Sequence, residues 1–184
     1  MSSPSLLTAN LTCHPQSHAP GVRGLSVRVS ERADGTLTFR YALDADMTHV
    51  VVPPIRPTRP AHELWKHTCF EAFLAEPESD AYTELNFAPS TEWARYHFER
   101  YREGMTPVLD PRAPAIVVRS DERSLELDAV VRPGGVFADR NGAKLRIGIA
   151  AVLEHADGSH SYWALQHAPG KPDFHHRDNF ILEL

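Results

Sequence analysis

The sequence predicts an all-β chain: a two-sheet antiparallel β-sandwich of the jelly-roll or immunoglobulin-like type, with about ten strands. Three observations predict this class. Apolar and polar residues alternate with a period of two along most of the 184 residues, and no segment keeps the period of a helix. Turn signals separate the alternating segments at spacings of about 8–12 residues, which is typical of sandwiches and barrels.

The clearest element is a β-hairpin in the first quarter of the chain. Leu25, Val27 and Val29 alternate with polar residues, Asp34-Gly35 supplies a turn, and the alternation then resumes. We therefore expect strands at 25–29 and 37–43. Segment 47–60 is too rich in proline for a central strand, so we expect a long surface loop there.

More strands are expected through the rest of the chain. Segment 92–101 fits either a strand or a helix by its period, and its high aromatic content favours the strand. Turns are expected at 121–123 and 157–158, and a longer loop that can hold one helical turn begins at Pro133. The remaining predicted strands are 67–74, 81–88, 115–119, 124–132, 144–154, 159–167 and 179–184.

Composition limits the partners that we expect. A net charge of −5 without a basic cluster argues against nucleic acid, whose phosphates require a basic surface. No apolar run approaches the roughly 20 residues that span a bilayer, so no membrane partner is expected. The N-terminus lacks a cationic start and a continuous apolar stretch. We therefore expect a cytoplasmic protein, and an extracytoplasmic one only if a leader has been trimmed.

The length suits one domain, 1–184, in which 1–20 can be an irregular segment. Cys13 and Cys69 are too few for a disulfide framework, and no CxxC pair indicates zinc. We expect two reduced thiols, while a single bridge between them stays open.

Polar side chains on one face of a predicted strand are the first sign of a site. In segment 81–88, Tyr82, Glu84 and Asn86 share one face. An aromatic ring, a carboxylate and an amide are the mixture that binds polyhydroxylated ligands. The alternative is a solvated outer face.

Glu71 is the second sign, because it lies between Cys69 and Phe73 in a strand that is otherwise apolar. A buried carboxylate requires a partner, since an isolated one costs several kcal/mol. If Glu71 lies beside Glu84 on an adjacent strand, the pair needs a cation, a shared proton or a ligand. The alternative is a structural ion pair with Arg or Lys.

Aromatic and histidine side chains complete the candidates. Trp65 and Trp93 are candidate stacking walls, because an indole face covers the C–H surface of a sugar ring, whereas Trp163 is expected in the core. Eleven histidines are present, but no metal-ligand spacing such as HExxH appears, so the metal ligands are unknown. His175 is expected to close the site from a C-terminal loop.

Six ordered blocks, 64–74, 82–90, 93–96, 101–105, 161–165 and 172–175, resemble DOMON-like bacterial proteins related to family 9 carbohydrate-binding modules. The resemblance implies a β-sandwich with one ligand site, a role for Glu71 as the acidic site residue, and calcium or haem as cofactors. Haem-binding relatives use Met and His as axial ligands; Met47, Met105 and the eleven histidines are candidates, but no matching pair stands out.

We therefore predict a non-catalytic domain that binds a small molecule, most simply a carbohydrate, through Trp65, Glu71, Tyr82, Glu84, Asn86, Trp93 and His175. Three alternatives stay open. One is a haem- or metal-binding domain, and another is a protein-interaction domain that uses sheet edges. The third is a glycoside hydrolase-like enzyme, whose two carboxyl groups would lie about 5–10 Å apart.

Overall fold

The computed structural model describes residues 5–108, 112–132 and 144–184, and within these ranges the chain is built from twelve antiparallel strands and short 3-10 turns. The strands are β1 (Ser5–Cys13), β2 (Val22–Glu31), β3 (Leu37–Ala45), β4 (Cys69–Ala75), β5 (Tyr82–Phe87), β6 (Trp93–Phe98), β7 (Thr106–Pro107), β8 (Ala115–Ser120), β9 (Ser124–Val131), β10 (Arg146–Glu154), β11 (His160–Ala164) and β12 (Leu182–Glu183). The 3-10 turns are η1 (Met47–His49), η2 (Leu64–Lys66) and η4 (Arg177–Asn179).

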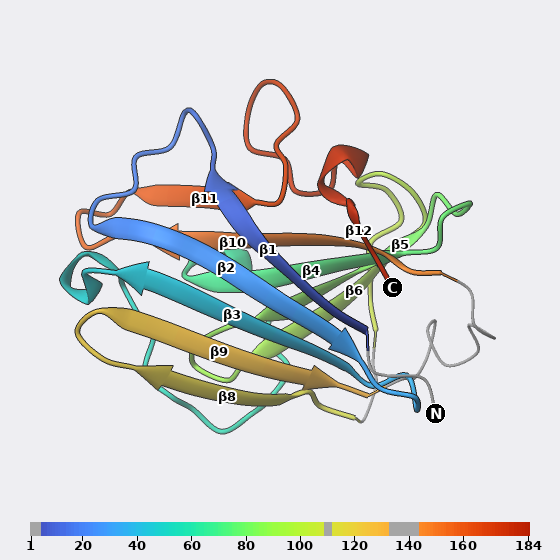
Figure 1. The fold of residues 1–184 in the computed structure, drawn as a ribbon, viewed down its shortest axis with the longest axis horizontal. Helices are drawn as coiled ribbons and strands as arrows, with labels where there is room; N and C mark the ends of the chain where they lie inside the picture. The colour runs from blue at the N-terminus through green and yellow to red at the C-terminus, as the bar shows by residue number, and fades with distance from the viewer. Residues whose placement is uncertain (1–4, 109–111, 133–143) are drawn as a thin grey trace.

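The strands form one hydrogen-bonded path in the order β7-β6-β5-β4-β10-β11-β1-β2-β3-β9-β8, with β12 added to β10 (Figure 1). Strand β1 joins the two halves of the path. It pairs with β2 from Ser5 to Leu11 and with β11 at Thr12 and Cys13. The all-β antiparallel class is therefore confirmed, but two separate sheets are not.

The path curls so that its two halves face one another across the main core. Alternate residues of β2, β3 and β9 pack against alternate residues of β4, β5 and β10. The ring centroids of Tyr41 and Phe70 are 5.0 Å apart, and those of Phe39 and Phe87 are 5.9 Å apart. The buried hydroxyl of Tyr41 donates to the backbone oxygen of Glu71 at 2.8 Å. Trp163 belongs to this core, as predicted.

The predicted hairpin is confirmed as β2 and β3. Their ladder runs from Val22 to Glu31, and Gly35 has a φ of 77°, which glycine adopts without strain. Segment 92–101 forms strand β6 rather than a helix, and the proline-rich segment after η1 forms no strand. The loop predicted from Pro133 lies outside the described residues.

Two strands of the described chain were not predicted, β1 and β7, which accounts for twelve strands instead of ten. Segment 1–20 is therefore not irregular over Ser5–Cys13. Exposed Leu6 interrupts the alternation of inward-facing Leu7 and Ala9, so the pattern of β1 is weak. Segment 179–184 forms only the short β12, because η4 occupies its beginning.

A second apolar cluster covers the other face of β4, β5, β6 and β10, and it is there that the candidate site lies. The turn η2 packs over this face from one side and the segment 172–180 from the other. Gly148 permits the close approach of the second segment, since a Cβ there would lie 3.0 Å from Nδ2 of Asn179. The Arg146 guanidinium holds the same segment by donating to the backbone oxygen of Phe180 at 2.8 Å.

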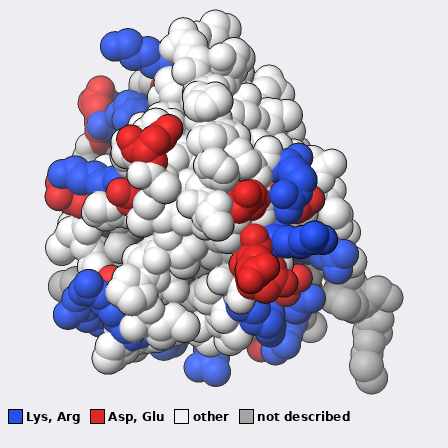
Figure 2. Space-filling model, turned by 90° about the vertical axis from the view of Figure 1, so that its left-hand side faces the viewer, with Lys and Arg blue, Asp and Glu red and all other residues white. Residues whose placement is uncertain are grey.

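Charges of both signs are mixed on the surface shown in Figure 2, where Lys and Arg side chains lie beside Asp and Glu side chains. Ion pairs of the described chain include Arg23 with Asp44 and Arg59 with Glu92. None of the helices in the described ranges has the length and apolar character that a membrane crossing requires. Cys13 and Cys69 are free thiols.

Candidate functional site

Strand register brings the predicted polar residues onto one face. Side chains alternate along a strand, so the inward positions of Phe70, Ala72 and Leu74 direct Glu71 to the opposite face. Glu71 lies directly across the ladder from Asn86, and Phe73 lies across from Glu84. Glu71 and Glu84 are therefore diagonal neighbours on adjacent strands, about 7–8 Å apart at the backbone.

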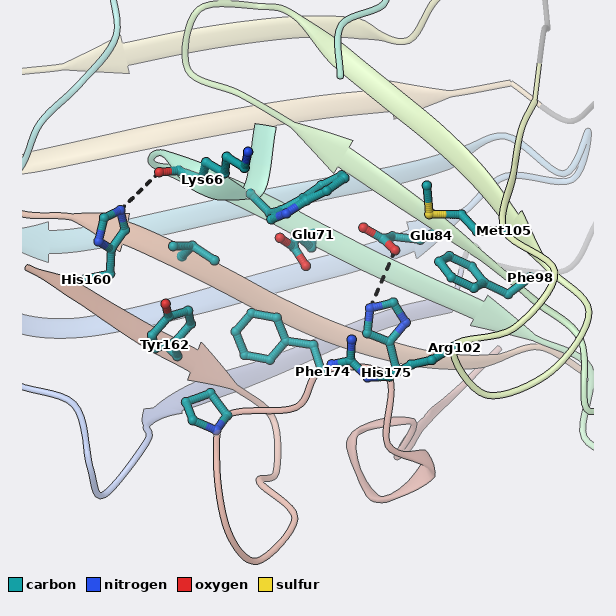
Figure 3. A pocket seen from close by; sticks show the side chains of 13 residues that line it. Lys66, Glu71, Glu84, Phe98, Arg102, Met105, His160, Tyr162, Phe174 and His175 are labelled. Atoms are coloured by element: carbon teal, nitrogen blue, oxygen red, sulfur yellow. Dashed lines mark hydrogen bonds and ion pairs between the residues drawn. The ribbon is translucent and has the colours of Figure 1, made fainter. Parts of the chain in front are cut away.

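A cavity of about 570 Å³ opens over these two carboxyl groups. Glu71 and Glu84 form its floor, while Phe174 and His175 approach from the opposite side (Figure 3). The lining residues are Trp65, Lys66, Glu71, Glu84, Phe98, Arg102, Met105, Val152, His160, Tyr162, Pro172, Phe174 and His175. Segments far apart in the sequence thus build one site.

Both carboxyl groups of the floor are buried, with 3% of Glu71 and 5% of Glu84 exposed. Oε1 of Glu84 accepts a hydrogen bond from Nδ2 of Asn86 at 2.7 Å. Oε1 of Glu71 has no hydrogen-bond partner among the described residues. The carboxyl group of Glu84 is therefore held in place, whereas that of Glu71 has an unsatisfied acceptor.

Burial raises the pKa of both carboxyl groups. For Glu84 it raises the pKa to about 7, although the Asn86 hydrogen bond and the charge of Arg102 act in the other direction. For Glu71, burial and then the Glu84 carboxylate raise the pKa well above its ordinary value, against the charge of Arg102. A proton or a cation therefore stabilises this floor near neutral pH.

His175 faces Glu84 and is held by Tyr82. The Tyr82 hydroxyl lies 2.7 Å from Nδ1 of His175 and accepts from the backbone N–H of Arg102 at 3.2 Å. If this hydroxyl donates to Nδ1, the ring proton is on Nε2, which lies 3.8 Å from Oε2 of Glu84. Burial and the charge of Arg102 lower the pKa of His175 to about 4. The imidazole is therefore neutral at pH 7, and its approach to Glu84 is not an ion pair.

Arg102 is fixed at the rim rather than paired with the floor. Its Nη2 lies 2.8 Å from Oδ1 of Asp173, and the Tyr101 hydroxyl donates to the other oxygen of that carboxylate. The residue has a φ of 54°, in the left-handed region. This clamp joins the loop after β6 to the C-terminal segment that carries His175.

Aromatic rings form the walls. Trp65 meets the Tyr96 ring edge-on, with centroids 5.8 Å apart, and Tyr162 lies 6.1 Å from Phe174. The Tyr82 and Phe98 rings stack at 4.8 Å behind His175. Such walls match the apolar face of a sugar ring or attract a cation.

The structure brings four of the seven predicted site residues to the cavity: Trp65, Glu71, Glu84 and His175. Tyr82 and Asn86 lie behind the lining and position His175 and Glu84.

The prediction that places Trp93 in this site needs correction. Trp93 pairs with Phe87, whose side chain points into the main core, so the alternation of β6 directs Ala94, Tyr96 and Phe98 toward the site face and Trp93 away from it.

Several lining residues were missed by sequence reasoning. Phe98 shares the face of Tyr96, so the alternation of β6 contained a signal for it. No sequence pattern indicated Arg102 or Phe174, because each of them reaches the cavity from a loop. Block 101–105 was indicated only by the resemblance, whereas block 172–175 was also indicated by its histidine, His175.

Calcium and haem, the cofactors that the resemblance implies, stay predictions, but one candidate ligand pair in the cavity does not fit haem. Met105 and His175 both line the cavity, but both ring nitrogens of His175 already face protein groups, Tyr82 and Glu84, so this pair does not fit haem ligation. Met47 packs against the main core instead. Within the described ranges, no three or more His, Cys, Asp or Glu side chains are grouped so that they could hold a metal ion.

Comparison with solved structures shows where else this fold occurs. The chain is similar to a protein from Bacteroides uniformis ATCC 8492 described as "a putative carbohydrate-binding protein", with a TM-score of 0.64 and 12% sequence identity over 95% of this chain and 84% of that one. It is also similar to a family 9 carbohydrate-binding module from Caldicellulosiruptor kristjanssonii in complex with glucose, with a TM-score of 0.46 and 9% identity over 87% of this chain and 76% of that one.

No family model matches the chain, and no curated protein sequence matches it. At 12% identity, the likeness to the Bacteroides uniformis protein shows a shared all-β fold. The closer resemblance to DOMON proteins stays a prediction.

Proposed function

We propose that the chain is a non-catalytic binding protein that holds a carbohydrate, or a similar polyhydroxylated small molecule, in the cavity over β4 and β5. One observation carries the proposal: the carboxyl group of Glu71 lines a cavity of about 570 Å³ and is buried with an unsatisfied oxygen. A buried acceptor without a partner destabilises the protein alone and becomes satisfied when a ligand hydroxyl donates to it.

The surroundings of Glu71 support the same function. Acceptor groups on the floor suit sugar hydroxyls, and the Trp65 and Phe174 rings suit the C–H surface of a sugar ring. The protein with a similar fold from Bacteroides uniformis is described as "a putative carbohydrate-binding protein", which agrees with this proposal.

Titration of the purified protein with a panel of mono- and disaccharides, followed by tryptophan fluorescence and calorimetry, tests the proposal. Glu71→Ala should weaken binding of the sugar that is found by roughly tenfold or more, the size of one hydrogen bond to a charged group. Trp65→Ala should weaken binding and remove the fluorescence change. Trp93→Phe is the matched control, because Trp93 faces away from the cavity, and it should leave both unchanged. Unchanged affinity in Glu71→Ala and Trp65→Ala would contradict the site.

A glycoside hydrolase-like activity is the second candidate, favoured by one observation. A carboxyl group with a pKa of about 7, such as Glu84, can act as a general acid beside a second carboxyl group. Incubation of the wild type and Glu84→Gln with aryl glycosides separates the two functions. A binding protein releases no aryl alcohol in either case, whereas an enzyme releases it only in the wild type.

A further inference from the structure

The floor of the cavity carries two acidic groups on one small surface. Glu71 and Glu84 project from adjacent strands as diagonal neighbours, so a single small group can contact both. Both are more than nine-tenths buried, and Oε1 of Glu71 is unsatisfied within the described chain. Two buried carboxylates repel one another unless a positive charge lies between them.

The positive side chains of the lining are already paired elsewhere. Arg102 binds Asp173 at 2.8 Å, and Lys66 binds Glu63, also at 2.8 Å. The neutral imidazole of His175 adds no charge, since its pKa lies at about 4. Arg102 therefore acts on the floor only at longer range. The other titratable groups that interact with the floor are Tyr41 on β3, Cys69 on β4, Tyr82 on β5 and Tyr96 on β6, and His160 on β11 also lines the cavity.

The walls add a second kind of attraction for a cation. Trp65, Tyr162 and Phe174 line the cavity around the carboxyl groups. An aromatic face attracts a cation within about 6 Å of its centroid, most strongly in a site from which water is excluded. The carboxylates of the floor and the aromatic rings of the walls therefore stabilise a bound ammonium group more strongly than a bound hydroxyl group.

We propose that the ligand of this cavity is an amino sugar, whose ammonium group lies between the carboxylates of Glu71 and Glu84 while its ring packs against the aromatic walls. The inference rests on the proposed function and narrows it from polyhydroxylated molecules to cationic ones. The ammonium group donates to the unsatisfied oxygen of Glu71 and neutralises the repulsion between the two carboxylates. A hydroxyl group of a neutral sugar can also donate to Glu71, but it carries no charge. The repulsion between the two carboxylates is then removed only by a proton bound to one of them.

Calorimetry with matched sugars tests this inference. Glucosamine, galactosamine and mannosamine are each compared with the parent hexose and the N-acetyl derivative, which keep the ring and lack the charge. At least one amine should bind roughly tenfold or more tightly than both neutral partners, as one charge-assisted hydrogen bond predicts. Glu71→Gln and Glu84→Gln should abolish that preference. Glu126→Gln is the matched control, because it removes an equal charge from an exposed position on β9.

The outcomes separate the two proposals. If neutral sugars bind as tightly as the amines, the cation inference is overturned while carbohydrate binding stands. If no sugar of any kind binds, the proposed function fails and this inference fails with it.

A second measurement uses the wild type alone, so that its result does not depend on whether the variants fold. Binding of the amine at pH 6.5 should release protons, seen as a different heat in two buffers of unlike ionisation enthalpy, whereas a neutral sugar should release none. Amine binding without proton release would also overturn the inference.

Discussion

Asn86 donates a hydrogen bond from its side-chain Nδ2 to Oε1 of Glu84 at 2.7 Å, and on the ladder between β4 and β5 it lies directly opposite Glu71. One amide thus fixes one carboxyl group of the floor and borders the other. It also accepts from the buried thiol of Cys69, whose Sγ lies 3.6 Å from its Oδ1. Asn86 is therefore a positioning residue beneath the cavity.

We expect Asn86→Ala to weaken this arrangement in two measurable ways. The free energy of unfolding at pH 7.5 should fall by about 1–3 kcal/mol, because a buried carboxylate loses its donor. The pKa of Glu84 should rise above its present value of about 7, since the Asn86 hydrogen bond lowers it. Urea denaturation at several pH values measures both effects. Asn10→Ala on the exposed side of β1 is the control, and equal effects of the two substitutions would contradict the role of Asn86.

The stability of the protein should fall as the pH rises from 6.5 to 8. Folded Glu84 keeps its proton up to about pH 7, whereas in the unfolded chain the group ionises near its ordinary pKa of 4.5. The folded state therefore binds more protons in this window, and the free energy of unfolding decreases by about 1 kcal/mol between pH 6.5 and 8. Glu71 changes stability in the same direction, because its pKa is raised as well.

Glu84→Gln should make this decrease shallower, with Glu71 supplying the remainder, and should make the protein more stable than the wild type at pH 8. The pH range of this test begins at 6.5 because another group changes the stability below that value. The pKa of His175 is lowered from 6.5 to about 4, so this group makes stability rise with pH below 6.5 and masks the carboxyl effect there. Thermal melts of the wild type, Glu84→Gln and Glu126→Gln measure the slopes. A wild-type slope that persists in Glu84→Gln would show that other groups are responsible.

Tyr82→Phe should loosen the segment that closes the cavity. The hydroxyl of Tyr82 lies between Nδ1 of His175 and the backbone N–H of Arg102, so its removal leaves both without this partner. We expect a loss of about 1–2 kcal/mol in the free energy of unfolding and faster hydrogen exchange over residues 172–176. Tyr162→Phe, the same change on β11, is the comparison. Equal exchange in the wild type and Tyr82→Phe would mean that the Tyr82 hydroxyl does not hold the segment, which then depends on other contacts such as the Arg102–Asp173 clamp.

The sequence by itself determined the strands and the faces within each strand. Alternation placed Tyr82, Glu84 and Asn86 together because side chains two residues apart point to one side of a strand. It set Glu71 on the same side as Cys69 and Phe73. The mixed strand or helix pattern of 92–101 was decided correctly by its aromatic residues, since these suit a pleated, half-buried surface.

Only the tertiary structure decided which strands are neighbours and which face of each is covered. Alternation relates residues along one strand, but hydrogen-bonded ladders can pair any two strands in many registers. The whole sheet decides that β4 pairs with β5 in the register that places Glu71 opposite Asn86. It also decides that Trp93, which is paired with Phe87, faces away from the site. The arrival of Arg102 and His175 from two loops depends on contacts about 70 residues apart, such as Arg102 with Asp173, for which no local pattern exists.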